Sequence, residues 1–380
     1  MMEKAIHLFD DPKITQNLRP ISYIRSLAEH WIGLSKIHEK WSAVTHSKVS
    51  WGEVTQHPNV LNILGSVLPS QELIQELQNL PEQTSLYFKG QLIAFRGLVT
   101  PTAEGNTVNS QAHLVFFSKF EDLLSLNAEL LKKEISPNVF DQQKLKEQGN
   151  LVIQPENCFI DPTADLKGSI LDASQGPIYI GKHVSIQIGT LIQGPAAILD
   201  YSCTNLGAKI RPYTTIAPHC KVGGEISNSI FYPYSNKGHD GYAGSSIIGS
   251  FCNWGAMTCA SNVKNDLNFI DIFDYPTAKP RKTNTKSLGV IMGDFVTTGI
   301  GTRFNTGTVV GNHCNISGRQ FLPKFIPSLT WGEYPHVKKY DFDKALTNAK
   351  KWAKAKNQEI AENSAKLIEQ IWKEEANARN

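Results

Sequence analysis

The sequence predicts a chain of three parts: an N-terminal α/β domain, a parallel β-helix of hexapeptide repeats, and a C-terminal helix. Three observations support this fold class. Large, mostly aliphatic residues recur every six positions through much of residues 180–316. The first 150 residues show strand and helix patterns without a repeat. The chain after Phe342 places its apolar residues on one face of a helix.

The six-residue repeat is the strongest pattern in the chain. Its leading residues form three blocks: Ile180, Ile186, Ile192, Ile198, Thr204, Ile210, Ile216 and Val222; then Tyr242, Ile248, Trp254 and Ala260; then Met292, Thr298, Phe304, Val310 and Ile316. A smaller residue follows each leading position by four, as in Val184, Ala196, Ala208, Cys220, Cys252 and Cys314. Glycine often comes directly after the leading residue, as in Gly181, Gly249 and Gly299.

A period of six matches neither the 3.6-residue period of a helix nor the alternation of a simple strand. It is typical of a solenoid in which each hexad is a short strand plus a corner, and three hexads make one coil. The leading and the smaller residues would fill the narrow interior, and glycine would allow the corners to turn.

Two gaps interrupt the repeat, and both are predicted to be loops extruded from the stack. One spans Ser227–Gly241, a glycine-punctuated stretch that contains His239. The other spans roughly Asn265–Gly289. Solenoids tolerate such loops on one face, and loops of this kind often carry the function.

The flanking segments set the expected domains. A strand is expected at 5–9, helices at 70–80 and 118–134, and a hairpin at 85–97 around Lys89–Gly90. The domains are therefore expected at 1–150, 151–325 and 326–380. The last is a proline-rich connector followed by a long helix, with a break expected near Lys356–Asn357.

Composition excludes several classes of protein. The chain is 41% hydrophobic and 19% charged, with a net charge of +3, so neither nucleic acid nor an anionic membrane is an expected partner. The start, MMEKAIHLFDD, predicts no signal peptide, and no apolar run is long enough to span a membrane. The six cysteines form no C-x-x-C pair, so no metal site is expected, and a reducing, cytoplasmic location is expected.

The stretch around the first gap resembles the acetyltransferase half of the bifunctional enzyme that makes UDP-N-acetylglucosamine. The matching residues are Gly238, His239, Tyr242, Ile248, Gly249, Asn253, Gly255, Ala256 and Asn262. The whole chain resembles a divergent branch of that family, in FDDPKITQNLRPISYIRS, in NKGHDG before the later coils, and in FIPSLTWG after them. The resemblance implies a left-handed β-helix and an N-terminal domain similar to sugar nucleotidyltransferases.

The resemblance also implies an activity: acetyl transfer from acetyl-CoA to an amino-sugar phosphate or nucleotide sugar. His239 would be the general base, because histidine can accept the amine proton near neutral pH. Glu225 would orient the imidazole ring. The substrate-binding residues implied are Arg211, Lys237, Tyr242, Asn253 and Asn262.

Other interpretations of these residues stay open from the sequence. Arg211 could be a simple ion-pair partner, and Tyr242, on a leading position of the repeat, could be a core residue. Lys237 could be solvated. Ser227 stands where the family has a phosphate-binding lysine, and Lys237 is the residue expected to compensate.

The N-terminal domain departs further from the family. The family's glycine-rich loop cradles phosphates, but here the first strand runs into DDPKITQNLRP, which has no glycine. Arg19 and Arg25 are the residues expected to contact phosphate instead, and Mg²⁺ would be needed only if this domain were active. Two rival functions remain: a UTP- or dTTP-dependent nucleotidyltransferase, and a non-catalytic scaffold.

The assembly expected from the sequence is a homotrimer. A coil of three hexads has the shape of a prism, and flat prism faces can pack around a threefold axis. The partners expected are therefore the small-molecule substrates and two further copies of the chain.

Overall fold

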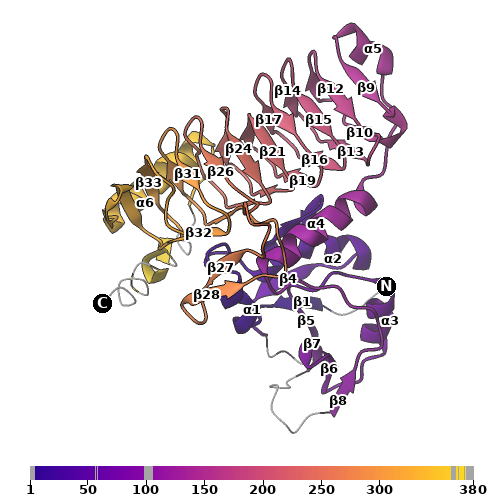
Figure 1. The fold of residues 1–380 in the computed structure, drawn as a ribbon. Coiled ribbons are helices and arrows are strands. Elements are labelled where there is room, and N and C mark those ends of the chain that lie inside the picture. The colour runs from indigo at the N-terminus through magenta and orange to yellow at the C-terminus, as the bar shows by residue number, and fades with distance from the viewer. Residues whose placement is uncertain are drawn as a thin grey trace. The chain divides into compact units, whose positions relative to one another are not determined.

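The structure of the protein is a computed structural model that describes residues 5–55, 57, 59–97, 106–360, 365–366, 368–371 and 373 (Figure 1). Two compact units divide the chain. The first contains the described parts of residues 1–18, 25–31 and 35–122. The second contains Arg19–Ile24, Ile32–Leu34 and the described chain from Leu123 onward. The boundaries expected at residues 150 and 325 stay predictions.

The first unit is built on a six-stranded mixed sheet in the order β4-β1-β5-β7-β6-β8. Its strands are β1 (Ala5–Phe9), β4 (Val49–Gly52), β5 (Val60–Leu64), β6 (Thr84–Phe88), β7 (Gln91–Arg96) and β8 (Asn106–Asn109). Its helices are α1 (Pro12–Asn17), α2 (Ile37–Thr45) and α3 (Gln71–Asn79), and α4 (Phe120–Glu134) continues into the second unit. The strand at 5–9, both helices and the hairpin expected in this region are therefore confirmed.

Short segments complete this part of the chain. They are the 3₁₀ helix η1 (Leu27–Glu29), the paired strands β2 (Trp31–Ile32) and β3 (Ser35–Lys36), and α5 (Gln142–Glu147) with the 3₁₀ helix η2 (Pro155–Asn157) near the first coil.

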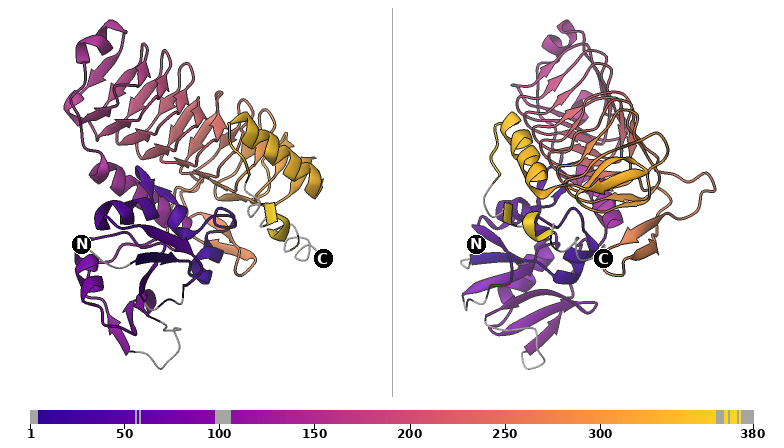
Figure 2. Two further views of the ribbon diagram at one scale, coloured as in Figure 1. Left: turned by 180° about the vertical axis from the view of Figure 1, so that it is seen from behind. Right: turned by 90° about the vertical axis from the view of Figure 1, so that its left-hand side faces the viewer.

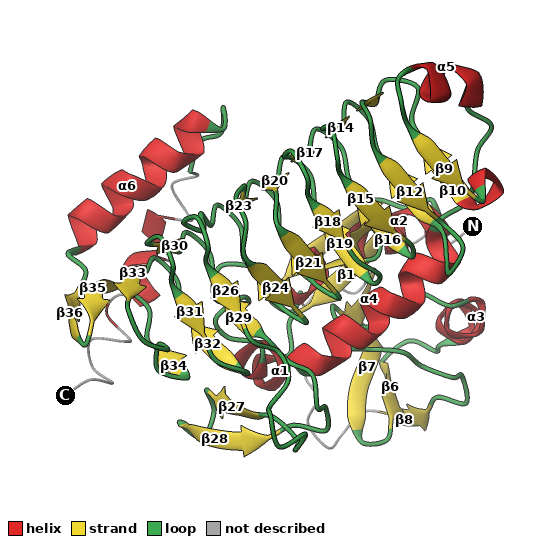
Figure 3. Ribbon diagram, turned by 45° about the horizontal axis from the view of Figure 1, so that its top comes forward, coloured by secondary structure: helices red, strands yellow, loops and turns green. Residues whose placement is uncertain are grey.

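Three parallel sheets form the β-helix of the second unit, and Figures 2 and 3 show its stacked coils from further sides. The first sheet contains β10 (Cys158–Ile160), β13 (Ile178–Ile180), β16 (Ala196–Ile198), β19 (Thr214–Ile216), β22 (Ile230–Phe231), β25 (Ile247–Ile248), β29 (Val290–Met292), β32 (Thr308–Val310) and β34 (Phe325–Ile326). The second contains β11 (Asp165–Leu166), β14 (Ser185–Ile186), β17 (Cys203–Thr204), β20 (Lys221–Val222) and β23 (Asn236–Lys237). Bridges through Asn253 continue it to β30 (Thr297–Thr298), β33 (Asn315–Gly318) and β35 (Thr330–Tyr334), and β36 (His336–Lys339) then pairs with β35 in antiparallel fashion.

The third sheet carries four of the residues expected at the site, namely Arg211, Glu225, Tyr242 and Asn262. Its strands are β9 (Leu151–Ile153), β12 (Ile170–Asp172), β15 (Leu191–Gln193), β18 (Lys209–Ile210), β21 (Glu225–Ser227), β24 (Tyr242–Gly244), β26 (Cys259–Ala260) and β31 (Arg303–Phe304). Figure 3 shows these strands side by side along one face.

The interior of the β-helix confirms the hexapeptide pattern with one exception. The leading residues of the first block are buried, as are their smaller followers, including Cys220, and so are Cys252 and Cys314 of the later blocks. None of the six cysteines, all of which the structure describes, forms a disulfide bond. Tyr242, however, is not a core residue: Ala243 pairs with Ile226 in the interior, and Tyr242 pairs with Glu225 on the outer surface.

The prediction that the first gap is an extruded loop is wrong, because the coils continue through this segment in register. Strand β22 pairs with β19, and β23 pairs with β20. Thr204 pairs with Val222, and the chain between them forms a coil of full length. Val222 pairs in turn with Lys237, but fewer residues lie between these two. Shortened corners therefore shift the phase of the repeat without leaving the stack.

The second gap is an extruded hairpin, as expected. It contains β27 (Asp271–Asp274) and β28 (Lys279–Lys282), which pair in antiparallel fashion. Phe273 stacks on Phe325 of the last coils at 3.6 Å between ring centroids. Tyr275 meets Tyr23 edge to face at 5.9 Å. The insertion therefore packs segment 19–24 of the same unit against the β-helix.

One corner of the β-helix, between the first and second sheets, carries a continuous ladder of aromatic rings. Seven residues form it: His183, Tyr201, His219, Tyr234, Phe251, Phe295 and His313. Successive rings lie 4.8–5.0 Å apart. All seven residues have positive φ values, a backbone conformation that residues other than glycine rarely adopt. At this corner the unusual conformation occurs together with the stacking of rings from successive coils.

The C-terminal helix α6 (Phe342–Ala355) ends where a break was expected. Ala345, Ala349 and Ala353 form its buried stripe. Lys356 follows the helix and donates from Nζ to the Oδ1 atom of Asn236 at 2.9 Å, which attaches this end to strand β23. In the part of the chain that the structure describes, no helix has the length and apolar character needed to cross a membrane.

Candidate functional site

His239 lies in the corner loop Gly238–Gly241, which joins β23 on the second sheet to β24 on the third. Its side chain is exposed. The loop itself is well anchored, because Asn205, two coils earlier, donates from Nδ2 to the carbonyl oxygen of Gly238 at 2.6 Å. The corner therefore presents a histidine to solvent on a backbone that neighbouring coils hold in place.

A pocket of about 400 Å³ opens beside this loop. It spans four successive coils along the same edge of the β-helix. Its lining residues are Gln187, Asn205, Leu206, Lys221, Gly224, Gly238, His239 and Asp240. The lining combines a histidine, a lysine and two amide side chains, which are groups able to bind a polar or anionic ligand.

Four other predicted site residues gather on the outer surface of the third sheet. Arg211 pairs with Glu225 at 3.3 Å, and both are partly exposed. Tyr242 of the next coil donates its hydroxyl to the Oδ1 atom of Asn262 at 3.4 Å. Burial raises the pKa of Tyr242, and the negative charge of Glu225 raises it further. Arg211, Glu225, Tyr242 and Asn262 are hereafter called the face cluster.

The orientation of His239 by Glu225 stays a prediction. The Glu225 carboxylate is engaged by Arg211, and among the residues that the structure describes the His239 ring makes no hydrogen bond. The two residues are nevertheless linked through the backbone, since the amide of Glu225 donates to the carbonyl oxygen of Gly241 at 3.0 Å.

Asn253 lies on a different face from the face cluster. Its backbone bridges Asn236 and Thr297 on the second sheet, and its amide donates to the carbonyl of Val296 at 2.8 Å. The side chain is half-buried. The structure therefore does not bring Asn253 into the group on the third sheet, and its contact with substrate stays a prediction.

Lys237 corrects the sequence analysis. It was expected to bind substrate phosphate, but it is only 1% exposed and occupies an interior position of the β-helix. Its ammonium donates to the carbonyl oxygens of Gly223, His239 and Gly241 at 2.9, 3.0 and 2.8 Å. An ammonium has three donors, so none is left for a phosphate group in this arrangement. Lys237 therefore cannot compensate for Ser227.

Sequence reasoning missed two polar contributions to the site. Asn205 was not singled out, although it lies at the same edge of the β-helix, two coils before the His239 loop. Ser287, at the end of the insertion, accepts from Asn262 Nδ2 at 3.1 Å and lies 2.8 Å from the hydroxyl of Ser245. Asn205 occupies a recognisable corner position of the repeat, whereas no short-range signal connects Ser287 to Asn262.

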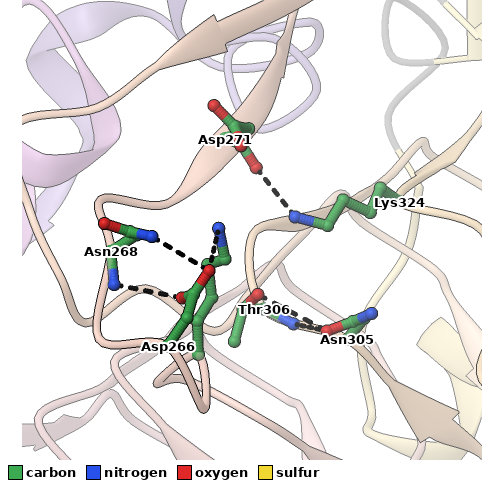
Figure 4. Close-up of polar contacts among 7 residues, drawn as sticks. Asp266, Asn268, Asp271, Asn305, Thr306 and Lys324 are labelled. Atoms are coloured by element: carbon green, nitrogen blue, oxygen red, sulfur yellow. Dashed lines mark hydrogen bonds and ion pairs between the residues drawn. The ribbon is translucent and has the colours of Figure 1, made fainter.

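Polar residues at the base of the insertion pair with one another (Figure 4). Asp266 binds Asn268 in a local turn, and Lys264 pairs with Asp266 at 3.4 Å. Lys324 donates to the carbonyl oxygen of Asp271 at 3.4 Å. Across the described residues no group of three or more His, Cys, Asp or Glu side chains could hold a metal ion.

In the first unit, two carboxylates follow strand β1, where the family's phosphate loop would begin. Asp10 accepts from the Ser26 hydroxyl at 2.8 Å and from the Leu27 amide at 2.7 Å, and burial raises its pKa. Asp11 accepts from the Ile14 amide at 2.9 Å and so caps α1. The amides beside this strand end are therefore bound by carboxylates of the chain itself.

Arg19 and Arg25, the expected phosphate-binding arginines, belong to different compact units. Arg19 is in the second unit, where its guanidinium lies 4.2 Å from the centroid of the Tyr23 ring. Arg25 is in the first unit, where its charge adds to the effect of burial in lowering the pKa of His30. Their joint contact with phosphate stays a prediction.

Comparisons with known proteins point to one family. Residues 6–138 match the sugar nucleotidyl transferase family. The bifunctional protein GlmU of Methanocaldococcus jannaschii is 37% identical over 134 residues, which is 33% of this chain and 30% of that protein. A bifunctional sugar-1-phosphate nucleotidylyltransferase/acetyltransferase of Sulfurisphaera tokodaii is 28% identical over 144 residues, covering 37% of this chain and 35% of the relative. The match thus spans about a third of these relatives.

Solved β-helix structures align with the chain at low identity. The UDP-N-acetylglucosamine acyltransferase of Campylobacter jejuni is 18% identical, with a TM-score of 0.25 over 57% of this chain and 94% of that chain. Residues 6–138 therefore resemble sugar nucleotidyl transferases, and the hexapeptide coils that follow them form a parallel β-helix.

Proposed function

We propose that the chain is an acyltransferase that moves an acetyl group from acetyl-CoA to an amino-sugar phosphate or a nucleotide sugar. The observation that carries the proposal is the anchored His239 loop at the edge of the pocket, next to the coils that bear the face cluster. The chain's GlmU-like relatives support the same class of reaction. The place we propose for this reaction is the cytoplasmic synthesis of sugar nucleotides for the cell envelope.

In the proposed reaction, His239 accepts a proton from the acceptor amine as the nitrogen attacks the thioester carbonyl. The C–S bond breaks as the amide C–N bond forms, and the CoA thiolate leaves and takes up a proton. The residues proposed to hold the sugar and its phosphate are Arg211, Tyr242, Asn253 and Asn262. Arg211 suits a phosphate because its planar guanidinium can donate two parallel hydrogen bonds.

The direct test is acetyl transfer by His239→Ala, measured by release of free CoA with a panel of amino-sugar phosphates and nucleotide sugars. General-base catalysis contributes roughly 10²–10⁴-fold, so kcat should fall by about that factor. His183→Ala, an exposed histidine at another corner, is the matched control and should keep full activity. Glu225→Gln should cost less than His239→Ala if Glu225 only orients the ring. Full activity of His239→Ala would show that the base lies elsewhere.

We also propose that the active assembly is a homotrimer. Exposed apolar side chains line the edge that carries His239, on both sides of the loop: Ile188, Leu206, Met257 and Ile300. Contiguous exposed apolar residues mark interaction sites, and two further copies around a threefold axis would cover them. Ile188→Asp and Ile300→Asp should lower the mass measured by light scattering, whereas a parent chain that is monomeric at micromolar concentration would contradict the proposal.

Nucleotidyl transfer by the first unit is the second candidate, because residues 6–138 match the sugar nucleotidyl transferase family. We expect it to be weak or absent, since carboxylates rather than free amides lie at the end of β1. Mg²⁺ would be required only for this activity. The test is pyrophosphate release from UTP or dTTP with a sugar-1-phosphate. Robust release that Arg19→Ala or Arg25→Ala abolishes would assign the chemistry to this domain.

A non-catalytic scaffold is the remaining alternative. A thermal-shift screen separates it from the enzyme, because a ligand that binds the folded protein raises its melting temperature. Stabilisation by a CoA ester would favour the acyltransferase. A protein that binds neither CoA esters nor nucleotide sugars would favour the scaffold.

A further inference from the structure

Lys237 is the most unusual residue in the interior of the β-helix. It stands on the second sheet in register with Val222, at a position that Leu166, Ile186 and Thr204 fill in the earlier coils, and Trp254 occupies the equivalent place in the next coil. It is among the largest fully buried side chains among the described residues, with 1% of its surface exposed. Lysine is almost never fully buried unless its charge has partners.

The partners of this ammonium are backbone carbonyls of two adjacent corners. Gly223 supplies one acceptor at 2.9 Å, on the coil before the His239 loop. The loop itself supplies the other two, through His239 at 3.0 Å and Gly241 at 2.8 Å. The ammonium therefore links the carbonyl groups of His239 and Gly241 in the loop to the carbonyl group of Gly223 on the preceding coil.

The surrounding backbone leaves space for this arrangement. Gly224 has a φ of +65°, and a Cβ atom there would lie 2.7 Å from the Nζ atom of Lys237 and 2.6 Å from the Gly241 carbonyl oxygen. A residue with a side chain would displace the ammonium or the loop. The glycine pair Gly223–Gly224 is thus matched to the buried lysine of the next coil.

Two ionisable groups act on Lys237 besides its burial. Burial lowers the pKa of Lys237 to about 8, while Cys259 on β26 and Asp240 in the loop act in the opposite direction. The three carbonyl acceptors also favour the charged form, because a neutral amine cannot donate to all three. At neutral pH the group is therefore an ammonium that holds the loop.

We propose that Lys237 is a positioning residue for His239: its buried ammonium fixes the backbone of the Gly238–Gly241 loop and thereby the place of the imidazole at the pocket. The kinetic part of this inference rests on the proposed acetyl transfer. The structural part does not, because it concerns only how the loop is held.

The loop has reporters that do not depend on activity. The amide of Glu225 donates to the carbonyl of Gly241 at 3.0 Å, and the amide of Met257 donates to that of Asp240 at 2.8 Å. If Lys237 holds the loop, its removal should weaken both hydrogen bonds. Hydrogen exchange at these two amides measures that loosening directly.

The variant is Lys237→Met, which keeps an unbranched side chain of similar length and removes the donors. We expect exchange at the Glu225 and Met257 amides to become at least about tenfold faster. We expect kcat for acetyl transfer to fall by about 10–100-fold, because misplacing a reacting group by about 1 Å can cost 10²-fold. KM for acetyl-CoA should change little. Lys182→Met, at an exposed position of another corner, is the matched control and should match the parent in both measurements.

Asn205→Ala is the second variant, for the case that Lys237→Met does not fold. Asn205 holds the same loop from the other side through Gly238, so its loss should lower kcat and loosen the loop in the same direction. If the parent protein transfers no acetyl group, the proposed function fails, and the exchange measurement still decides the role of Lys237. Folded Lys237→Met with parental exchange at both amides, or with parental kcat in an active enzyme, would overturn the inference.

Discussion

Replacing His313 by phenylalanine should remove a large part of the acid sensitivity of the β-helix. His313 ends the aromatic ladder, 3% exposed, with its ring 4.8 Å from that of Phe295. Its Nε2 atom has no hydrogen-bond partner among the residues that the structure describes. Burial lowers the pKa of His313 from 6.5 to about 4, because the charged imidazolium would lose its hydration. The ladder already holds phenylalanine at Phe251 and Phe295 with similar positive φ values, so the substitution fits the backbone.

The sign of the effect follows from proton uptake. Between pH 6.5 and about 4 the unfolded chain binds a proton at His313 that the folded chain does not bind. Stability from this residue is therefore fully present above pH 6.5 and is lost as the pH falls toward 4. For one proton, the free energy of unfolding falls by about 1.4 kcal/mol per pH unit, and only the part of the interval below pH 6.5 counts. Acidification from about pH 7.5 to about pH 5 should therefore lower the free energy of unfolding by about 2 kcal/mol.

The assay is hydrogen exchange of the amides in β32 and β33, corrected for the intrinsic rate at each pH. It reports the free energy of openings that hydrate His313. The parent should lose about 2 kcal/mol more than His313→Phe between the two pH values. His183→Phe, at the exposed end of the same ladder, is the control and should behave like the parent. An equal loss in the parent and in His313→Phe would refute the reasoning.

Two further substitutions test the packing on which the site depends. Gly241→Ala should destabilise the His239 corner, because a Cβ atom there would lie against the carbonyl oxygen of Thr258. Gly52 has the same φ of +128°, but a Cβ atom there would have no atom within 4 Å, so Gly52→Ala should lower the melting temperature clearly less. Phe304→Ala should lower the free energy of unfolding by about 3–5 kcal/mol in urea titrations, because it leaves a cavity in the β-helix interior. The exposed Phe321→Ala should change it by no more than about 0.5 kcal/mol, and equal losses would contradict this account of the core.

The sequence by itself determined the β-helix because the repeat is local and its cause is simple. A narrow interior accepts one large and one small residue per hexad, so residues such as Ile198, Ile216 and Val310 reveal their burial through spacing alone. Strand β1, helices α3 and α4 and the β6–β7 hairpin were also predictable, since they follow from short-range hydrophobic patterns. The helix break near Lys356 follows from the same kind of pattern.

Spacing could not show where the coils became shorter. The shortened corner after Val222 shifts the phase of the repeat by a few residues. The same amino-acid sequence is therefore compatible with either an extruded loop or a continuing coil. Only strand pairing decides between them, as in the register of Val222 with Lys237. That register places Tyr242 outside and Ala243 inside, because a shift of one residue moves a side chain to the other face.

The site shows the same division. The motif around His239 marked the loop, and the family resemblance named Glu225 and Tyr242, which pair with each other on the third sheet. The role of Lys237 was not predictable, because a lysine beside a glycine-rich corner looks like a solvated charge. Only the tertiary structure places its ammonium among three carbonyls from two coils, where burial and hydrogen bonding make it part of the framework that holds His239.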